Sequence, residues 1–383
     1  MNTNDLISEI DKIIPVKERT DNFPKDVHDI LEAYKNIINK IDVSITSQYS
    51  EWKNTINTIK NINRAINGCI DSYYKGLHSK AYGVIKEYIL PLILAHTDSY
   101  TVKKGDLFYK ARIFENNRHR TYNEMFHISL NNRGIVRTQR YSFPGYPCLY
   151  LGSTIYSCWE EMDQPKFDDM MVSQFTASRD FLLFDLRKPN QLDFEQNLEK
   201  TLVRLPMVIA CSLRVKHQKD NYKPEYIIPQ LLIEYIIEQN RNLYNNEGKD
   251  LCELQIGVIY TSSRINNDME FPKRVFDNIA IPVFNTDGEY CQVLASCFSW
   301  TDPTCYEYEN LKKRFEPRIF HIDNDREEEN YKCSKMGELE ERLSSFEKKA
   351  FLHSVFTRTS IVLNQSGDPE DNGILCNTQY TIT

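Results

Sequence analysis

The spacing of apolar residues changes once along this chain, near Lys104, and this change most constrains how the chain can fold. Before it, over residues 1–99, apolar side chains recur three and four positions apart, the period of a helix with one buried face. The clearest series comprises Val27, Ile30, Leu31, Tyr34, Ile37, Ile38 and Ile41. Asp26 is expected to cap this helix, and Pro91 to end a later one. Residues 1–99 are therefore predicted to form a helical region with a structural or partner-binding role.

After Lys104 the apolar runs become short and rich in β-branched and aromatic residues, which is typical of strands. The runs are DLFYKARIF, CLYLG, FLLFDLR, PMVIACSLRV, QIGVIYTSS, IAIPVF and RIFHID. Residues 225–240 instead have helical spacing. The pattern predicts an α+β domain over residues 100–323. Residues 324–383 are expected to contain a charged helix and then a polar, disordered tail.

Composition excludes several classes of function. A formal net charge of −7 gives no general attraction to nucleic acid. The GxGxxG and P-loop motifs are absent, so a nucleotide site would have to be built in another way. The ten cysteines form no CxxC pair, and no metal site is expected. The start MNTNDLISEIDK lacks the features of a secretion signal and no apolar stretch is long enough to span a membrane, so a cytoplasmic protein is expected.

The stretch TQRYSFPGYPCLYLGSTIYSCWEEM, residues 138–162, brings chemically useful side chains to one corner. Arg140 precedes a turn, residues 148–151 form a strand, and Ser153 or Thr154 is expected to cap the next helix. The apolar face of that helix consists of Ile155, Cys158, Trp159 and Met162. At about 100° per residue, Glu161 falls at the edge of this face and Glu160 is predicted to point toward solvent.

Three residues in this stretch resemble the core of the RES domain family. In that family an Arg is followed ten residues later by a Tyr and eleven further on by a Glu, and Arg140, Tyr150 and Glu161 reproduce both intervals. The pieces FYKAR, EMFH, EYIIPQLL, GVIYTSS and GEYCQVLASCF also resemble, in order, a longer stand-alone RES subgroup. The resemblance covers roughly residues 104–300.

The resemblance implies a mixed β core like that of ADP-ribosyltransferases and an activity on NAD⁺, which would be the substrate and not a cofactor. Cleavage of the nicotinamide-ribose bond requires stabilisation of an oxocarbenium-like ribose, and a carboxylate suits that role, which falls to Glu161. Arg140, with Arg112 as a second clamp, is suited to the pyrophosphate. Tyr150 is the candidate for packing against nicotinamide.

Three further polar residues, of types that are common at the ends of strands and helices, are candidates for contacting the substrate. Ser262 ends a predicted strand, Gln230 begins a predicted helix, and Ser153 lies beside the helix cap; which residue plays the part of the family serine stays open. Family members often carry Arg at the position of Lys110. Lysine keeps the positive charge but lacks the bidentate geometry of arginine. Which part of the substrate Lys110 binds and which part Arg112 binds therefore stays open as well.

Three functions remain compatible with the sequence. The first is an NAD⁺ glycohydrolase or phosphorylase, and the second is a mono-ADP-ribosyltransferase acting on a protein. The third, from another class, is a non-catalytic NAD-binding regulatory or interaction protein. An antitoxin or a protein target is a possible partner under the toxin interpretation, and the helical region of residues 1–99 is a candidate for covering the site in cis.

Overall fold

The computed structural model describes residues 3–14, 20–41, 49–96, 98–113, 120–246, 250–264, 276–284, 288–306, 308–309, 331–332 and 334–350. Contacts group the chain into two compact units, Met1–Phe351 and Leu352–Thr383. The expected disordered tail and the run RIFHID lie outside the described residues. Among the helices that are described, none has both the length and the apolar character needed to cross a bilayer.

The N-terminal region is helical, as its spacing predicts. Its elements are α1 (Thr3–Ile13), α2 (Phe23–Ile38), α3 (Tyr49–Tyr74), α4 (His78–Val84), a π-helical turn (Ile85–Ile89) and α5 (Leu90–His96). Two of the helix boundaries predicted from the sequence are wrong. Asn22, not Asp26, caps α2, and the helix continues through Pro91. A wide π turn just before Pro91 moves away the carbonyl group that its ring would strike in a regular helix.

A mixed sheet forms the rest of the core, which confirms an α+β fold. Its nine described strands lie in the order β1-β5-β6-β7-β3-β2-β4-β8-β9, and every neighbouring pair is antiparallel except β5 and β6. The strands are β1 (Tyr100–Val102), β2 (Leu107–Ile113), β3 (Cys148–Gly152), β4 (Met170–Ala177), β5 (Phe181–Leu186), β6 (Gln255–Thr261), β7 (Asp277–Pro282), β8 (Phe298–Trp300) and β9 (Lys349–Ala350).

The remaining α-helices in the described part of the chain are α6 (Ile155–Glu161), α7 (Gln191–Gln196), α8 (Leu198–Ser212), α9 (Ile227–Asn240), α10 (Gln292–Cys297) and α13 (Lys335–Ser344). The run PMVIACSLRV lies mostly in α8, so its prediction as a strand is wrong. Nearly all of α8 is buried, and a run that is apolar on every side carries no periodicity to separate helix from strand. Strand β4 was missed for another reason: it is buried along almost its whole length, yet Ser173, Gln174 and Thr176 interrupt its apolar residues, so its sequence shows no apolar run. Helix α9 confirms the helical prediction for residues 225–240.

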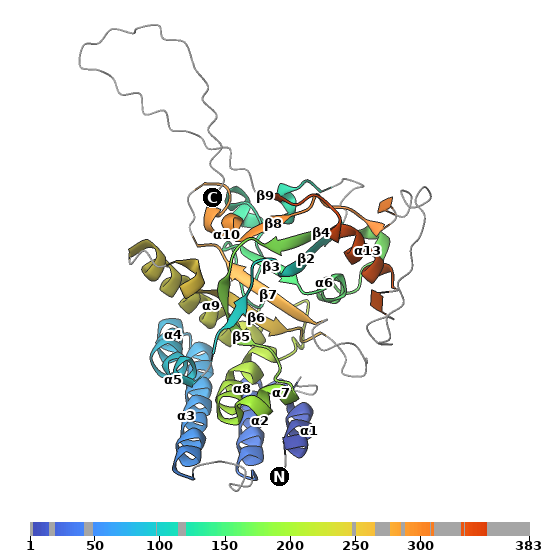
Figure 1. Ribbon diagram of the computed structural model, residues 1–383. Helices are drawn as coiled ribbons and strands as arrows, with labels where there is room; N and C mark the ends of the chain where they lie inside the picture. The colour runs from blue at the N-terminus through green and yellow to red at the C-terminus, as the bar shows by residue number, and fades with distance from the viewer. Residues whose placement is uncertain are drawn as a thin grey trace, which may run out of the picture. The chain divides into compact units, whose positions relative to one another are not determined.

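The N-terminal helices share one hydrophobic core with α8 and α9. Figure 1 shows α2 and α3 beside α8 and α1 beside α2 and α7, and residues from all of these helices belong to the same buried cluster. The buried hydroxyl of Tyr34 on α2 donates to the carbonyl oxygen of Leu202 on α8 at 2.6 Å. Residues 1–99 are thus an integral layer of the Met1–Phe351 unit.

The charged C-terminal segment also belongs to this unit. Its helix α13 packs on α6 and β4, with Leu339 and Leu343 buried in a small cluster, and β9 pairs with β8 at the sheet edge. The predicted charged helix is therefore present and forms part of the fold.

The sheet opens between β2 and β3. These strands pair only at Tyr109 and Gly152, whereas β2 pairs with β4 over seven residues and β3 pairs with β7 over five. A Cβ atom at Gly152 would lie 2.2 Å from Ser157 Oγ and 2.8 Å from Cys158 Sγ, so the junction has no room for a side chain. The two halves of the sheet diverge from this point.

Candidate functional site

A pocket of about 680 Å³ lies where the sheet opens. Strands β2 and β3, the end of α6, the segment after α8 and the ends of β6 and β7 contribute its walls. The residues used below are Lys110, Arg112, Arg140, Cys148, Tyr150, Cys158, Glu160, Glu161, Asp163, Arg214, Tyr226, Tyr260, Ser263, Arg264 and Asn278. No described residue of 1–99 lines this pocket, which does not support the hypothesis that the helical region covers the site.

The carboxylate of Glu161 is held by one of its oxygens. Ser262 Oγ donates to Glu161 Oε1 at 2.7 Å and Asn278 Nδ2 donates to the same atom at 2.9 Å. The other oxygen, Oε2, lies 3.6 Å from Arg264 Nε. One oxygen thus fixes the orientation of the carboxylate, and the second is placed to meet a hydroxyl group or a developing positive charge in the pocket.

Glu160 is buried, so the prediction that it points toward solvent is wrong. Only 6% of it is exposed, and it accepts hydrogen bonds from the Tyr156 hydroxyl at 2.5 Å and from Gln164 Nε2. Asp163 and Gln164 have φ values of 64° and 53°, and this left-handed turn brings Gln164 back onto Glu160. The helical-face argument failed because α6 is covered on more than one side.

Arg140 joins three segments around the pocket. Its Nη1 donates to Cys211 O at 2.7 Å, and its Nη2 donates to Leu213 O and to Ser263 Oγ, both at 2.9 Å. The guanidinium also lies 5.3 Å from the centre of the Tyr226 ring. All of these partners are neutral, so they leave the positive charge of Arg140 available to an anion in the pocket.

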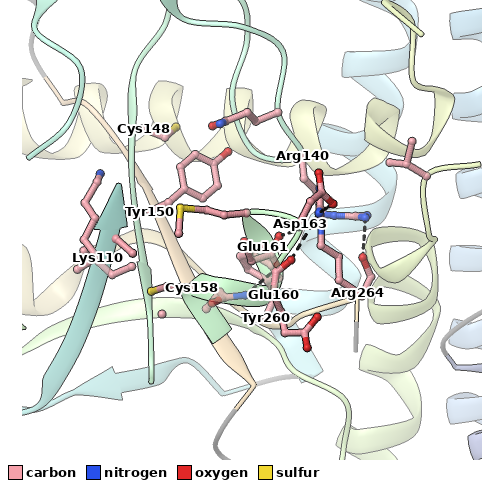
Figure 2. Close-up of a pocket in the computed structure, with 18 of the residues that line it drawn as sticks. Lys110, Arg140, Cys148, Tyr150, Cys158, Glu160, Glu161, Asp163, Tyr260 and Arg264 are labelled. Atoms are coloured by element: carbon pink, nitrogen blue, oxygen red, sulfur yellow. Dashed lines mark hydrogen bonds and ion pairs between the residues drawn. The ribbon is translucent and has the colours of Figure 1, made fainter. Parts of the chain in front are cut away.

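Tyr150 is fixed through its hydroxyl. That oxygen accepts from the backbone N–H of Tyr141 at 3.1 Å and donates to Ser142 Oγ at 3.3 Å. Burial raises the pKa of the Tyr150 hydroxyl well above its usual value, so the phenol stays neutral. The ring forms part of the pocket wall between Lys110 and the Glu161 end (Figure 2).

Lys110 and Arg112 project from β2 into the other end of the pocket. Burial, followed by the neighbouring Arg112 charge, holds the pKa of Lys110 well below its usual range. Arg112 Nη2 donates to Phe126 O at 3.3 Å. Two thiols lie in the same wall, and burial raises the pKa of Cys158 to about 12 and that of Cys148 still further. Both thiols are therefore uncharged and do not neutralise Lys110.

Of the eight predicted site residues, five line one pocket: Lys110, Arg112, Arg140, Tyr150 and Glu161. The other three lie around it. Ser262 holds Glu161, whereas Gln230 Nε2 donates to Thr138 Oγ1 and to the carbonyl oxygens of Gln139 and Ser142, which fixes the segment that carries Arg140. Ser153 does not line the pocket; its N–H donates to Asp277 O, while Thr154 caps α6.

Sequence reasoning missed Arg214, Arg264, Asn278, Tyr226 and Tyr260. Arg214 and Arg264 come just after α8 and β6, and a cation at the end of an element was the only local signal. Asn278 reaches Glu161 because β7 pairs with β3, a register that the sequence does not reveal. Within the described part of the chain, no group of three or more His, Cys, Asp or Glu residues could hold a metal ion.

Comparison with known proteins gives one informative similarity. The curated protein "Putative toxin YopC" of Bacillus subtilis (strain 168) is 34% identical to this chain over 200 residues, which are 48% of this chain and 43% of that relative. The chain thus spans less than half of the length of this relative. No family model and no solved structure matches. The chain is therefore similar in part to a protein named as a toxin.

Proposed function

We propose that this protein cleaves the bond between nicotinamide and ribose in NAD⁺, with Glu161 as the catalytic carboxylate. The proposal rests on the hydrogen bonds that orient Glu161: Ser262 and Asn278 donate to Oε1, and Oε2 is left at the pocket. A pocket in which Glu161 lies beside several cations, Arg140, Arg214 and Arg264 among them, suits a substrate that combines a cationic ring, a ribose and a pyrophosphate.

The chemistry requires little proton transfer. When the bond between the ribose C1′ and the pyridinium nitrogen breaks, its electron pair moves to the nitrogen, and nicotinamide leaves as a neutral molecule. The ribose carries the positive charge until an acceptor adds to C1′. With water as the acceptor, the products are ADP-ribose, nicotinamide and one proton. Glu161 Oε2 would hold a ribose hydroxyl and stabilise the charge as it develops.

The other pocket residues suit the remaining parts of this substrate. Arg140 keeps its charge while its donors fix its position, so it would orient the pyrophosphate without a cost of ordering on binding. The neutral Tyr150 ring offers a flat face for nicotinamide. The RES-like intervals and the opening of the mixed sheet between β2 and β3 both support an ADP-ribosyltransferase-like site here.

A toxin-like role follows from the same chemistry. Cleavage of NAD⁺ in the cytoplasm would deplete a central redox cofactor, and the partial similarity to a protein named as a putative toxin supports this role. Controlled expression in a bacterial host should lower growth and cellular NAD⁺ together, and Glu161→Gln should restore both. Growth arrest with an unchanged NAD⁺ level would contradict the proposed role.

The decisive experiment follows nicotinamide release from NAD⁺ by the purified full chain. Glu161→Gln keeps the size and shape of the side chain but removes its charge and replaces one acceptor oxygen by an amide donor, and should lower kcat by at least about a hundredfold, the scale of losing one electrostatic stabiliser. Asp168→Asn, at an exposed carboxylate, is the matched control. Absence of release by the wild type, or equal release by Glu161→Gln, would overturn the proposal. Label transferred from NAD⁺ to a protein would identify a protein as the acceptor.

A further inference from the structure

We propose that the pocket binds two separate phosphate groups, and that Lys110 with Arg112 forms a subsite for a phosphate monoester on the adenosine side of the dinucleotide. The term "lysine subsite" denotes these two residues. The proposal rests on the proposed function for the identity of the dinucleotide, and it makes a phosphorylated form such as NADP⁺ the preferred substrate.

One phosphate position lies beside Glu161. Arg140 Nη2 donates to Ser263 Oγ at 2.9 Å, Arg214 Nε donates to Ser263 O at 2.5 Å, and Arg264 follows Ser263 in the chain. These three arginines, here called the arginine cluster, line the same part of the pocket; Arg140 and Arg214 contact Ser263, whereas the Arg264 guanidinium forms ion pairs with Asp163 and Glu161. The pyrophosphate is linked to the nicotinamide ribose through its 5′ carbon, so it belongs near the carboxylate that acts on that ribose.

Within the lysine subsite, Lys110 lacks an opposite charge among the described residues. Lys110 is only 9% exposed and lines the pocket. It forms no hydrogen bond or ion pair with any residue that the structure describes, and no described carboxylate is among the charges that act on it. A buried ammonium group is costly unless it is paired. The lowered pKa of Lys110 expresses this cost, which an anion bound beside it would offset.

The two positions are too far apart to hold the same pyrophosphate. Ser263 follows β6 and Lys110 lies on β2, with β7 and β3 between them in the sheet. Three strand spacings amount to roughly 14 Å. Figure 2 shows Lys110 on the opposite side of Tyr150 from Arg140, Glu161 and Arg264. The two phosphorus atoms of a pyrophosphate share one bridging oxygen and lie much closer together than these two backbone positions, so we assign the pyrophosphate to the arginine cluster alone.

The chemistry of the dinucleotide suggests what fills the second position. The adenosine ribose follows the pyrophosphate, and a dinucleotide bound in a folded conformation, with its adenosine half beside its nicotinamide half, would bring a phosphate on that ribose to the Lys110 side of Tyr150. A phosphate monoester carries up to two negative charges and accepts hydrogen bonds from both lysine and arginine. Free inorganic phosphate has the same chemistry and is the other possible source.

The test measures binding without turnover, by calorimetry on the full chain. Adenosine 2′,5′-bisphosphate should bind the wild type at least about tenfold more tightly than 5′-AMP, the scale of one charge-assisted contact. Lys110→Met should remove this gain and leave the affinity for 5′-AMP within about twofold, whereas Lys110→Arg should keep the gain. Lys104→Met, at an exposed lysine in the turn before β2, is the matched control.

Each outcome decides the proposal. Equal binding of the two nucleotides by the wild type would overturn it, and so would an equal loss for both nucleotides in Lys110→Met, because Lys110 would then belong to the pyrophosphate clamp. Inorganic phosphate that binds in a Lys110-dependent way while the 2′-phosphate adds nothing would assign the subsite to free phosphate. Nicotinamide release, assayed separately in phosphate-free buffer, tests the proposed function. The two results are independent, because Lys110 can bind the 2′-phosphate in a protein that releases no nicotinamide, and release can occur in a protein that lacks the lysine subsite.

Discussion

Ser262 donates a hydrogen bond of 2.7 Å to Glu161 across a separation of 101 residues in the chain. The bond joins the segment that follows β6 to the last residue of α6. Together with Asn278 it fixes Oε1 and so gives Glu161 one preferred orientation, while Oε2 lies at the pocket 3.6 Å from Arg264 Nε. The positioning of the carboxylate is thus a property of three segments and not of the helix alone.

Removal of this support should reduce turnover more than substrate binding. Ser262→Ala removes one of the two donors to Glu161 Oε1, and a hydrogen bond to a charged group contributes about 1.5–3 kcal/mol. We expect kcat for nicotinamide release to fall about ten- to a hundredfold with a smaller change in KM. Ser296→Ala, at an exposed serine of α10, should leave both constants unchanged. A rise in KM with an unchanged kcat would argue against a positioning role.

Glu340 on α13 makes stability depend on pH. It accepts from the Ile155 N–H at the start of α6 at 2.6 Å and from the Tyr331 hydroxyl at 2.7 Å, yet burial raises its pKa to about 7. The folded state therefore holds a proton that the unfolded state has already released above its ordinary pKa of 4.5. Its contribution is present below pH 4.5 and is lost as the pH rises through about 7.

Urea unfolding between pH 4.5 and 8 checks this expectation. The free energy of unfolding of the wild type should fall with rising pH relative to that of Glu340→Gln, in which this group no longer titrates. Glu341→Gln, at the exposed neighbouring carboxylate, should follow the wild type. Parallel curves for the wild type and Glu340→Gln would show that Glu340 does not titrate in this range.

Gly152 marks the junction where the sheet opens. Gly152→Ala places a methyl group against Ser157 Oγ and Cys158 Sγ, so α6 must shift away from β3. We expect a loss of about 1–3 kcal/mol in the free energy of unfolding, the usual cost of overpacking, and a loss of activity because α6 carries Glu161. Gly134→Ala, where nothing lies within 4 Å of the added carbon, is the control. Wild-type stability of Gly152→Ala would refute the steric account.

Deletion of residues 1–99 should prevent folding. The deletion removes Tyr34 and its bond to Leu202 and exposes the apolar faces of α8 and α9 that share its core. Circular dichroism and gel filtration of the truncated chain should show an unfolded or aggregated protein. A folded truncation with raised activity would instead restore the hypothesis that the helical region covers the site.

Much of the local structure could be predicted from the sequence. Helical periodicity identified α2 and α9, and short apolar runs rich in β-branched and aromatic residues identified β2, β3, β5, β6 and β7. Two buried segments misled this reasoning: β4 was not recognised because polar residues interrupt it, and α8 was predicted as a strand because its run PMVIAC is continuously apolar. A segment that is apolar on every face is compatible with either structure, and only its neighbours decide between them.

Arg140, Tyr150 and Glu161 lie within 22 consecutive residues, so the sequence by itself determined that they share a turn, a strand and a helix. Only the tertiary structure decided that Glu160 is buried, that Ser262 and Asn278 hold Glu161, and that Arg214 and Arg264 reach the same pocket. The physical reason is the distance along the chain over which each interaction acts. Local periodicity follows from backbone geometry over a few residues, whereas these contacts depend on strand register and on packing between segments about a hundred residues apart.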